Sequence, residues 1–135
     1  MAEELAGKLE GKRVTLLGLS FKPGTDDMRE APSLRVVDEL IKRSITNIIG
    51  YDPKAKETAK VEFGDKIKYA DSIEEALKDS KCAFLITEWD EFKNLTPEDF
   101  KKSMKTPNLV DGRRLYDYDY FNKILPFRAI GRVNL

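Results

Sequence analysis

The chain has 135 residues, 41% of them hydrophobic and 36% charged, and its 24 basic residues balance its 24 acidic ones. This length and composition predict a single globular domain, and the lack of excess positive charge argues against nucleic-acid binding. One cysteine and no histidine leave no plausible zinc or copper site and no internal disulfide, so we expect no metal and a reducing, cytoplasmic environment.

Short apolar runs alternate with amphipathic segments along most of the chain. In chain order the sequence predicts a helix at 2–10, a strand at 13–19, a helix from 32, a strand at 47–51, a helix at 54–61, a strand near the sheet edge at 67–69, a helix at 72–78, a strand at 82–87, a helix from 96, and strands at 108–110 and 127–131. The run CAFLIT at 82–87 is apolar throughout, which is typical of a strand buried on both faces of a parallel sheet. This order predicts an α/β fold, a Rossmann-like doubly wound and mostly parallel sheet with helices on both faces.

Turn and capping residues mark several of the element ends. Pro32 suits the first turn of its helix, where a missing N–H does no harm, and Ser72 with Glu75 predicts a capping box. Asp52 follows the second predicted strand, where true dinucleotide-binding folds place an acid on the ribose. Because the glycine-rich dinucleotide fingerprint is missing from this chain, we interpret Asp52 as a helix-capping residue instead.

The loop FKPGTDDMREAPS, residues 21–33, is the most unusual feature of the sequence. It is twice as long as an ordinary strand-to-helix connection of about 2–6 residues, and it carries Lys22 and Arg29. Such cations suit phosphate, and the N-terminus of the following helix adds positive potential. The alternative is a structural loop in which the loop's own carboxylates pair with Arg29. Neither G-x-G-x-x-G nor a P-loop motif is present, so the loop is no ordinary NAD site.

Five further side chains have a plain structural interpretation. Cys82 lies in the apolar CAFLIT run, which predicts a buried core thiol rather than a nucleophile. Trp89 is predicted to pack the loop that follows this strand, with stacking on a ligand as the alternative. Tyr116, Tyr118 and Tyr120 alternate with aspartates, and we interpret them as surface or interface aromatics.

The stretch GKRVTLLGLSFKPGTDDMREAPS, residues 11–33, strongly resembles the signature that opens the C-terminal domain of the UDP-glucose/GDP-mannose dehydrogenase family. The resemblance continues through YDP at 51–53, TEW at 87–89 and VDGRR at 110–114, and it covers nearly the whole chain from about Lys12. Members of this family use NAD to oxidise the C6 alcohol of a nucleotide sugar to a carboxylate. They combine an NAD-binding domain, a helical dimerisation region and a C-terminal domain that helps to hold the nucleotide sugar.

The resemblance implies a division of the chain and a division of labour. Residues 1–11 would be the tail of the connecting helix, and residues 12–135 would be the nucleotide-sugar (UDP)-binding domain. Neither the NAD fingerprint nor the family's catalytic cysteine motif occurs in this sequence. The resemblance therefore implies no catalytic residue here, and we expect the isolated chain to be inactive as a dehydrogenase.

The same resemblance implies roles for one aromatic and three cationic residues. Phe21, Lys22 and Arg113 would contact the nucleotide sugar, with Lys22 near the diphosphate or the sugar. Arg29 would face the NAD that a separate domain binds. At Arg114 the resemblance leads us to expect an asparagine, and this departure leaves the role of Arg114 open.

The implied partners are a nucleotide sugar, UDP-glucose or a related one, and the NAD-binding and dimerisation regions of a homodimeric enzyme. The same family could instead act on UDP-N-acetylmannosamine or GDP-mannose, and a free-standing nucleotide-binding module is a further alternative. The charged N-terminus lacks a secretory apolar region and no apolar run is long enough to span a membrane, so we expect no membrane partner.

Overall fold

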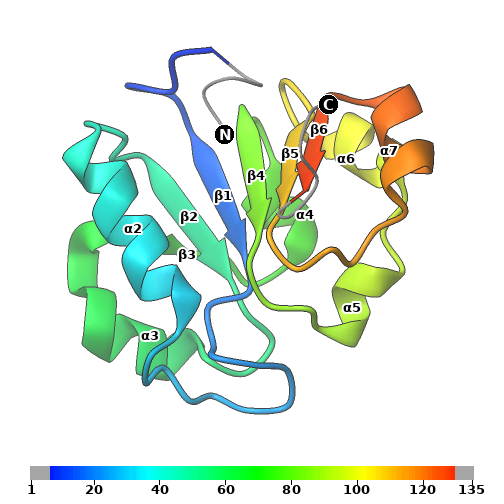
Figure 1. The fold of residues 1–135 in the computed structure, drawn as a ribbon. Coiled ribbons are helices and arrows are strands. Elements are labelled where there is room, and N and C mark those ends of the chain that lie inside the picture. The colour runs from blue at the N-terminus through cyan, green and yellow to red at the C-terminus, as the bar shows by residue number, and fades with distance from the viewer. Residues whose placement is uncertain (1–6, 130–135) are drawn as a thin grey trace.

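Within residues 7–129, which the computed structural model describes, six parallel strands form one sheet in the order β3-β2-β1-β4-β5-β6 (Figure 1). The strands are β1 (Val14–Leu17), β2 (Ile48–Tyr51), β3 (Lys68–Tyr69), β4 (Cys82–Leu85), β5 (Asn108–Asp111) and β6 (Phe127–Ala129). The helices are α2 (Pro32–Lys42), α3 (Lys56–Phe63), α4 (Ile73–Leu77), α5 (Asp90–Lys93), α6 (Pro97–Ser103) and α7 (Tyr118–Ile124), with a 3₁₀ turn at Gly64–Lys66. The predicted doubly wound α/β fold is confirmed, and every strand pair in the described part is parallel.

Some element predictions differ from the structure. The short helices α5 and α7 were not predicted, because four and seven residues are too few to show a clear helical period. Residues 7–10, the predicted end of the first helix, form a bend and a turn, and residues 2–6 lie outside the described residues. The last strand ends at Ala129, and residues 130–131 of the predicted strand also lie outside.

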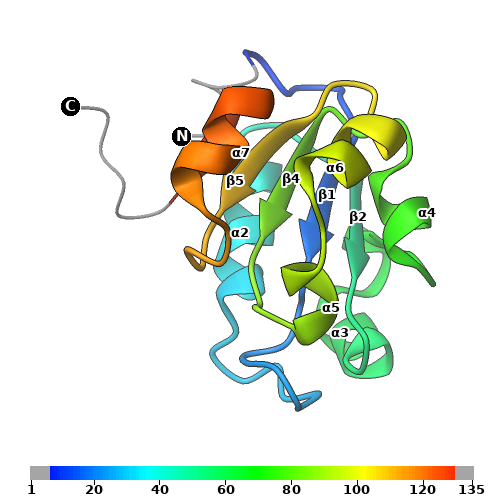
Figure 2. The same cartoon turned by 90° about the vertical axis from the view of Figure 1, so that its right-hand side faces the viewer.

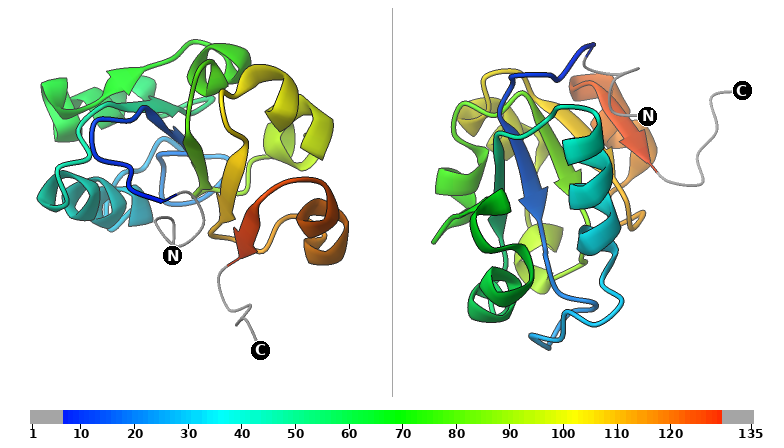
Figure 3. Two further views of the ribbon diagram at one scale, coloured as in Figure 1. Left: turned by 90° about the horizontal axis from the view of Figure 1, so that it is seen from above. Right: turned by 90° about the vertical axis from the view of Figure 1, so that its left-hand side faces the viewer.

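Alternation along the strands divides the core into two halves, one on each face of the sheet. From β1, Val14 and Leu16 pack with α2 and α3, whereas Leu17 joins the cluster that contains residues of α4, α5, α6 and α7. The central strand β4 divides in the same way, with Cys82 on the first face and Leu85 on the second. Figure 2 shows α5 and α6 in front of the sheet with α2 behind it, and the opposite view in Figure 3 (right) shows α2 in front. Burial on both faces explains why the strands are apolar at successive positions.

The helix ends confirm one predicted signal and correct another. Pro32 occupies the first turn of α2, as predicted. At α4, Ser72 Oγ accepts the Glu75 N–H at 3.0 Å, but the Glu75 carboxylate accepts the N–H of Asp71 instead of that of Ser72. The predicted box at Ser72 is therefore only half present. A complete capping box stands at α6, where Thr96 is the N-cap.

The interpretation of the tyrosines as surface aromatics is wrong for Tyr116. Its side chain is buried, it stacks on Phe121 with ring centroids 4.4 Å apart, and its hydroxyl donates to the carbonyl of Phe92 at 2.7 Å. Burial raises the pKa of the Tyr116 hydroxyl well above its usual value. Tyr118 is partly buried against the same cluster, and Tyr120 is exposed. The alternation of tyrosine and aspartate suggested that all three rings are exposed, but the chain forms a helix from Tyr118 onwards and the alternation does not continue as a surface pattern.

The strand order reverses between β1 and β4. The residues that follow the carboxyl ends of these two strands are closely packed against each other. Gly18, directly after β1, has a φ of +94°, and a Cβ placed there would lie 2.5 Å from Cβ of Thr87. Thr87 follows β4 across the same switch point. Only glycine allows these two segments of the chain to approach so closely, so Gly18 is required at the point where the long loop leaves β1.

We predict that Gly18→Ala lowers the free energy of unfolding by about 2–4 kcal/mol, since the new methyl group combines a disfavoured φ with overpacking against Thr87. Gly24→Ala is the matched control, because Gly24 has a φ of +84° but nothing within 4 Å of the added Cβ. The control should lose only about 1 kcal/mol. Urea unfolding measures both values, and equal losses in the two variants would contradict the close contact.

Candidate functional site

Three loops meet beyond the carboxyl ends of the central strands. They are the long loop after β1, the Thr87–Trp89 segment after β4, and the turn at 112–114 after β5. In Figure 1 the strands β1, β2 and β4 point towards the same end of the molecule, and the loop after β1 projects beyond it. Ligands of doubly wound sheets bind in this position, at the point where the strand order reverses.

The root of the long loop is the peptide segment Leu19–Ser20, and its polar backbone groups are all paired inside the domain. Both N–H groups donate to Oδ2 of Asp52, at 2.8 and 2.9 Å. The carbonyl of Leu19 accepts from the hydroxyl of Ser33 at 2.6 Å, and the carbonyl of Ser20 accepts from the hydroxyl of Thr87 at 2.8 Å. All of these side chains are buried. Residues from β2, α2 and β4 thus hold the loop from three directions.

Asp52 connects the turn after β2 with the root of the long loop, and it is not the N-cap of α3. Its Oδ1 accepts the N–H groups of Lys54 and Ala55, which orders the turn into α3, and its Oδ2 also accepts Nε1–H of Trp89 at 3.2 Å. The predicted helix cap is wrong, because the N-cap of α3 is Ala55 and has no side-chain capping bond, and Asp52 orders the turn before the helix instead. The bonds to Leu19, Ser20 and Trp89 were not foreseen. Because both carboxylate oxygens are engaged within the domain, Asp52 is not presented to a ribose.

Phe21 and Lys22 come directly after this fixed root and are exposed. Phe21 has 43% of its surface accessible and lines a hollow of about 480 Å³ together with Glu30, Ala31, Leu34 and Arg35. Its N–H donates to the carbonyl of Asp27 at 2.8 Å, which closes the loop on itself. The carbonyl of Lys22 accepts from the hydroxyl of Ser20 at 3.1 Å. An exposed aromatic ring and an ammonium group therefore stand on an ordered backbone.

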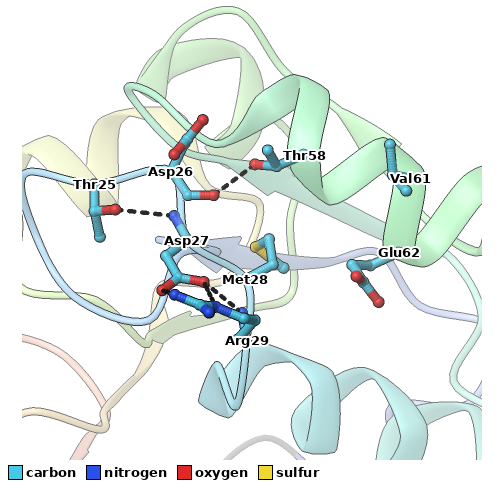
Figure 4. Close-up of a pocket in the computed structure, with 8 residues that line it drawn as sticks. All are labelled: Thr25, Asp26, Asp27, Met28, Arg29, Thr58, Val61 and Glu62. Carbon is cyan, nitrogen blue, oxygen red and sulfur yellow. Dashed lines mark hydrogen bonds and ion pairs between the residues drawn. The ribbon is translucent and has the colours of Figure 1, made fainter.

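Arg29 lies farther along the loop, across a hollow from α3 (Figure 4). Its Nε and Nη2 atoms donate to the two carboxylate oxygens of Asp27, at 3.1 and 3.0 Å. This pair confirms that a loop carboxylate positions Arg29, and the bonds from the guanidinium hold the pKa of the Asp27 carboxyl below its usual value. The Arg29 side chain is still 89% exposed. It borders a hollow of about 500 Å³, lined by residues of the loop and by Thr58, Val61 and Glu62 of α3.

Arg113 stands on the turn after β5 and is oriented by two carboxylates. Its backbone N–H donates to Oδ1 of buried Asp111 at 3.0 Å, and its Nε donates to Oε2 of Glu88 at 2.6 Å. The neighbouring Arg114 is exposed and has a φ of +55°, a left-handed conformation that asparagine adopts more readily than arginine.

The structure thus brings some predicted residues together and separates others. Phe21, Lys22 and Arg113 stand on loops at the same edge of the sheet, and the Thr87–Trp89 segment makes hydrogen bonds to both loops. Arg29 lines a different hollow from Phe21, between its loop and α3. The positioning contacts of Ser33, Thr87, Glu88 and Asp111 were not predicted from the sequence. The TEW motif contained two of them, but its bonding partners lie far away in sequence.

Cys82 does not lie at this edge of the sheet. It is the first residue of β4, at the opposite end of the strand, and it is buried in the core as predicted. Burial raises the pKa of its thiol to about 12, so the thiolate that a nucleophile requires does not form at neutral pH. Among residues 7–129, no group of three acidic, histidine or cysteine side chains could hold a metal ion. No helix in the same range is long and apolar enough to cross a membrane.

The sequence matches the model of the UDP-glucose/GDP-mannose dehydrogenase family, UDP binding domain, over residues 15–118. UDP-glucose 6-dehydrogenase YwqF of Bacillus subtilis is 42% identical over 113 residues, which are 84% of this chain and 26% of that protein. UDP-glucose 6-dehydrogenase AglM of Haloferax volcanii is 42% identical over 107 residues, 79% of this chain and 24% of that protein. The chain therefore spans about a quarter of the length of these curated relatives.

Solved structures give the same result. A UDP-glucose dehydrogenase from Pyrobaculum islandicum superposes with a TM-score of 0.81 at 27% identity, over 98% of this chain and 28% of that one. A UDP-D-ManNAc dehydrogenase from Pyrococcus horikoshii superposes with a TM-score of 0.74 at 30% identity, over 97% of this chain and 28% of that one. Sequence match and fold agree, and the chain belongs to the UDP-glucose/GDP-mannose dehydrogenase family, as its UDP-binding domain.

Proposed function

We propose that this domain binds the nucleotide of a UDP-sugar for a UDP-glucose 6-dehydrogenase-like enzyme, which oxidises the sugar C6 alcohol to a carboxylate with NAD. The observation that carries the proposal is the pair of cations, Lys22 and Arg113, on two ordered loops that follow β1 and β5 at the carboxyl edge of the sheet. Two positive side chains at one edge are suited to a diphosphate, and arginine can bind phosphate oxygens in a bidentate manner.

Each of the three proposed binding residues supplies a different interaction. Lys22 provides a point charge near the diphosphate or the sugar, and Arg113 provides a planar set of donors. Phe21 provides an exposed aromatic surface beside the hollow that it lines. The buried hydrogen bonds at Leu19–Ser20 fix the backbone before a ligand arrives, so that binding orders little additional chain.

The residues of this domain do not fit an NAD site of their own. Asp52 is engaged internally, and the loop after β1 contains no dinucleotide fingerprint. We propose that NAD is bound by a separate domain and that Arg29 contributes only a contact from outside. Its exposed guanidinium, braced by Asp27, is suited to reach an anion that arrives on a neighbouring domain.

Two UDP-sugars are candidates for the substrate. UDP-glucose is favoured, because the two relatives with 42% identity are both UDP-glucose 6-dehydrogenases. The UDP-D-ManNAc dehydrogenase from Pyrococcus horikoshii, at 30% identity, supports a UDP-N-acetylhexosamine as the second candidate. We further propose a cytoplasmic homodimer for the complete enzyme. Calorimetric titration with UDP, GDP, UDP-glucose and NAD tests the nucleotide part of the proposal, which requires UDP to bind more tightly than GDP or NAD.

We predict that Lys22→Ala and Arg113→Ala each weaken UDP binding by roughly tenfold to a hundredfold, the effect of losing a charge-assisted hydrogen bond. Lys78→Ala is the control, because Lys78 is an exposed lysine at the end of α4, just before β4 and away from its carboxyl end. The control should bind UDP like the parent. If both site variants also match the parent in calorimetry, the assignment of this edge is wrong.

We predict that Arg29→Ala changes the affinity of this chain for UDP by less than about twofold, because Arg29 lines a different hollow from Phe21. Its exposed ion pair with Asp27 contributes little to stability, so the melting temperature should also stay nearly constant. A parallel fall in UDP affinity and melting temperature would instead show that Arg29 only braces the loop. In an enzyme that contains the NAD domain, the same change should raise KM for NAD or lower kcat.

We also predict that the chain on its own produces no NADH from UDP-glucose or UDP-N-acetylmannosamine, because it offers neither an NAD site nor a reactive thiolate. Absorbance at the NADH band, followed at high protein concentration, measures this. Sustained turnover by the pure chain would contradict the proposed division of labour between domains.

A further inference from the structure

We propose that the segment Thr87–Glu88–Trp89 is the positioning element of the site and sets where Lys22 and Arg113 stand relative to each other. The inference rests on the proposed role of these two cations in binding the diphosphate. The three side chains contact different partners: Thr87 bonds the root of the Lys22 loop, Trp89 bonds Asp52, which holds the same root, and Glu88 bonds Arg113. The segment therefore connects two loops that are not neighbours in the chain.

Thr87 acts on the Lys22 side. Its buried hydroxyl donates to the carbonyl of Ser20 at 2.8 Å, two residues before Lys22, and the hydroxyl of Ser20 in turn donates to the Lys22 carbonyl. The Thr87 side chain is buried and packs closely against the backbone at Gly18. Removal of this hydroxyl would leave a buried carbonyl without its partner and would free the backbone that carries Lys22.

Trp89 strengthens the same connection from the other side of the peptide. Its Nε1–H donates to Oδ2 of Asp52, the oxygen that also accepts the N–H groups of Leu19 and Ser20. Trp89 is the single tryptophan of the chain, so its fluorescence reports on this junction alone. A change at the loop root should be visible there without any added label.

Glu88 acts on the Arg113 side. Its Oε2 accepts from Nε at 2.6 Å, and within residues 7–129 the structure records no other partner for this guanidinium. An arginine held through Nε presents its two Nη groups outwards, which is the arrangement that binds two phosphate oxygens. Glu88 is half-buried beside the sheet, so its own position is less variable than that of an exposed acid.

A competing effect must be weighed against this positioning. The carboxylate of Glu88 is itself an anion near the place proposed for a diphosphate, and its charge opposes binding. The longer-range opposition weakens with added salt, whereas the close and partly buried pair that orients Arg113 is screened much less. If positioning dominates, removal of Glu88 weakens UDP binding, and the loss is larger at high ionic strength, where the relief of repulsion is screened.

Crossed double variants test the two connections separately. Thr87→Val should weaken UDP binding roughly two- to tenfold, since an unfixed loop must be ordered on binding. In the Lys22→Ala background this loss should shrink below about twofold, whereas in the Arg113→Ala background it should persist. Glu88→Ala should show the reverse pattern, losing its effect with Arg113→Ala and keeping it with Lys22→Ala. Equal losses in both backgrounds would mean general loosening and would overturn the proposal.

Conservative variants serve as controls. Thr87→Ser keeps the hydroxyl and Glu88→Gln keeps an acceptor for Nε–H, so both should bind UDP within about twofold of the parent. Asp90→Asn removes a charge two residues beyond Glu88 from a side chain paired with Lys93, and it should have no effect. Tighter binding by Glu88→Ala would identify Glu88 as a competing anion and would also overturn the proposal.

A measurement without ligand separates this inference from the proposed function. In ¹H–¹⁵N NMR spectra, Glu88→Ala should shift the Arg113 Nε–H signal and leave the amide signals of Phe21 and Lys22 in place. Thr87→Val should shift those amides and the Trp89 fluorescence but not the Arg113 signal. If UDP fails to bind or Lys22→Ala and Arg113→Ala are silent, the proposed function fails, while these spectra still decide the positioning role. Unchanged spectra in both variants would refute it.

Discussion

The buried hydrogen bonds around the peptide segment Leu19–Ser20 are the constraint on which the rest of the site depends. Two N–H groups and two carbonyls are removed from water there, and an unpaired group would cost about 1–3 kcal/mol. Asp52, Ser33 and Thr87 satisfy all four. Because these partners come from three different elements, the loop cannot leave its place without breaking bonds to the whole carboxyl end of the sheet. The long charged loop can keep one ordered conformation because its root is held in this way.

Local placement rather than net charge provides the cations at this edge. The chain is neutral overall, and the guanidiniums of Arg29 and Arg113 are each braced by one carboxylate. In both pairs some guanidinium N–H groups have no partner among the described residues, so the arginine is oriented and can still donate hydrogen bonds to a ligand. Such pairs contribute little to stability at an exposed surface. Their effect is to reduce the motion that a ligand would otherwise have to suppress.

The comparison with dinucleotide-binding domains shows how one topology serves another ligand. Strand order and the acid after β2 are both retained, yet Asp52 turns inwards and bonds the domain's own loops. The glycine-rich turn is replaced by a longer loop that offers side-chain cations instead of backbone N–H groups. The fold therefore indicates only where a ligand binds, and the loop residues decide which ligand it is.

The sequence by itself determined the fold class, the position of most strands and helices, and the loops that carry Phe21, Lys22 and Arg113. Each of these follows from patterns within a short window: apolar runs, turn residues and one long charged connection. It failed for Tyr116, whose burial depends on packing against α5 and α7, two helices too short to recognise. Only the tertiary structure decided that Asp52 holds the loop root and that Thr87 and Glu88 reach the two cation-bearing loops. Their partners lie 25 to 67 residues away, and a hydrogen bond between such distant residues exists only once the sheet has brought the strand ends together.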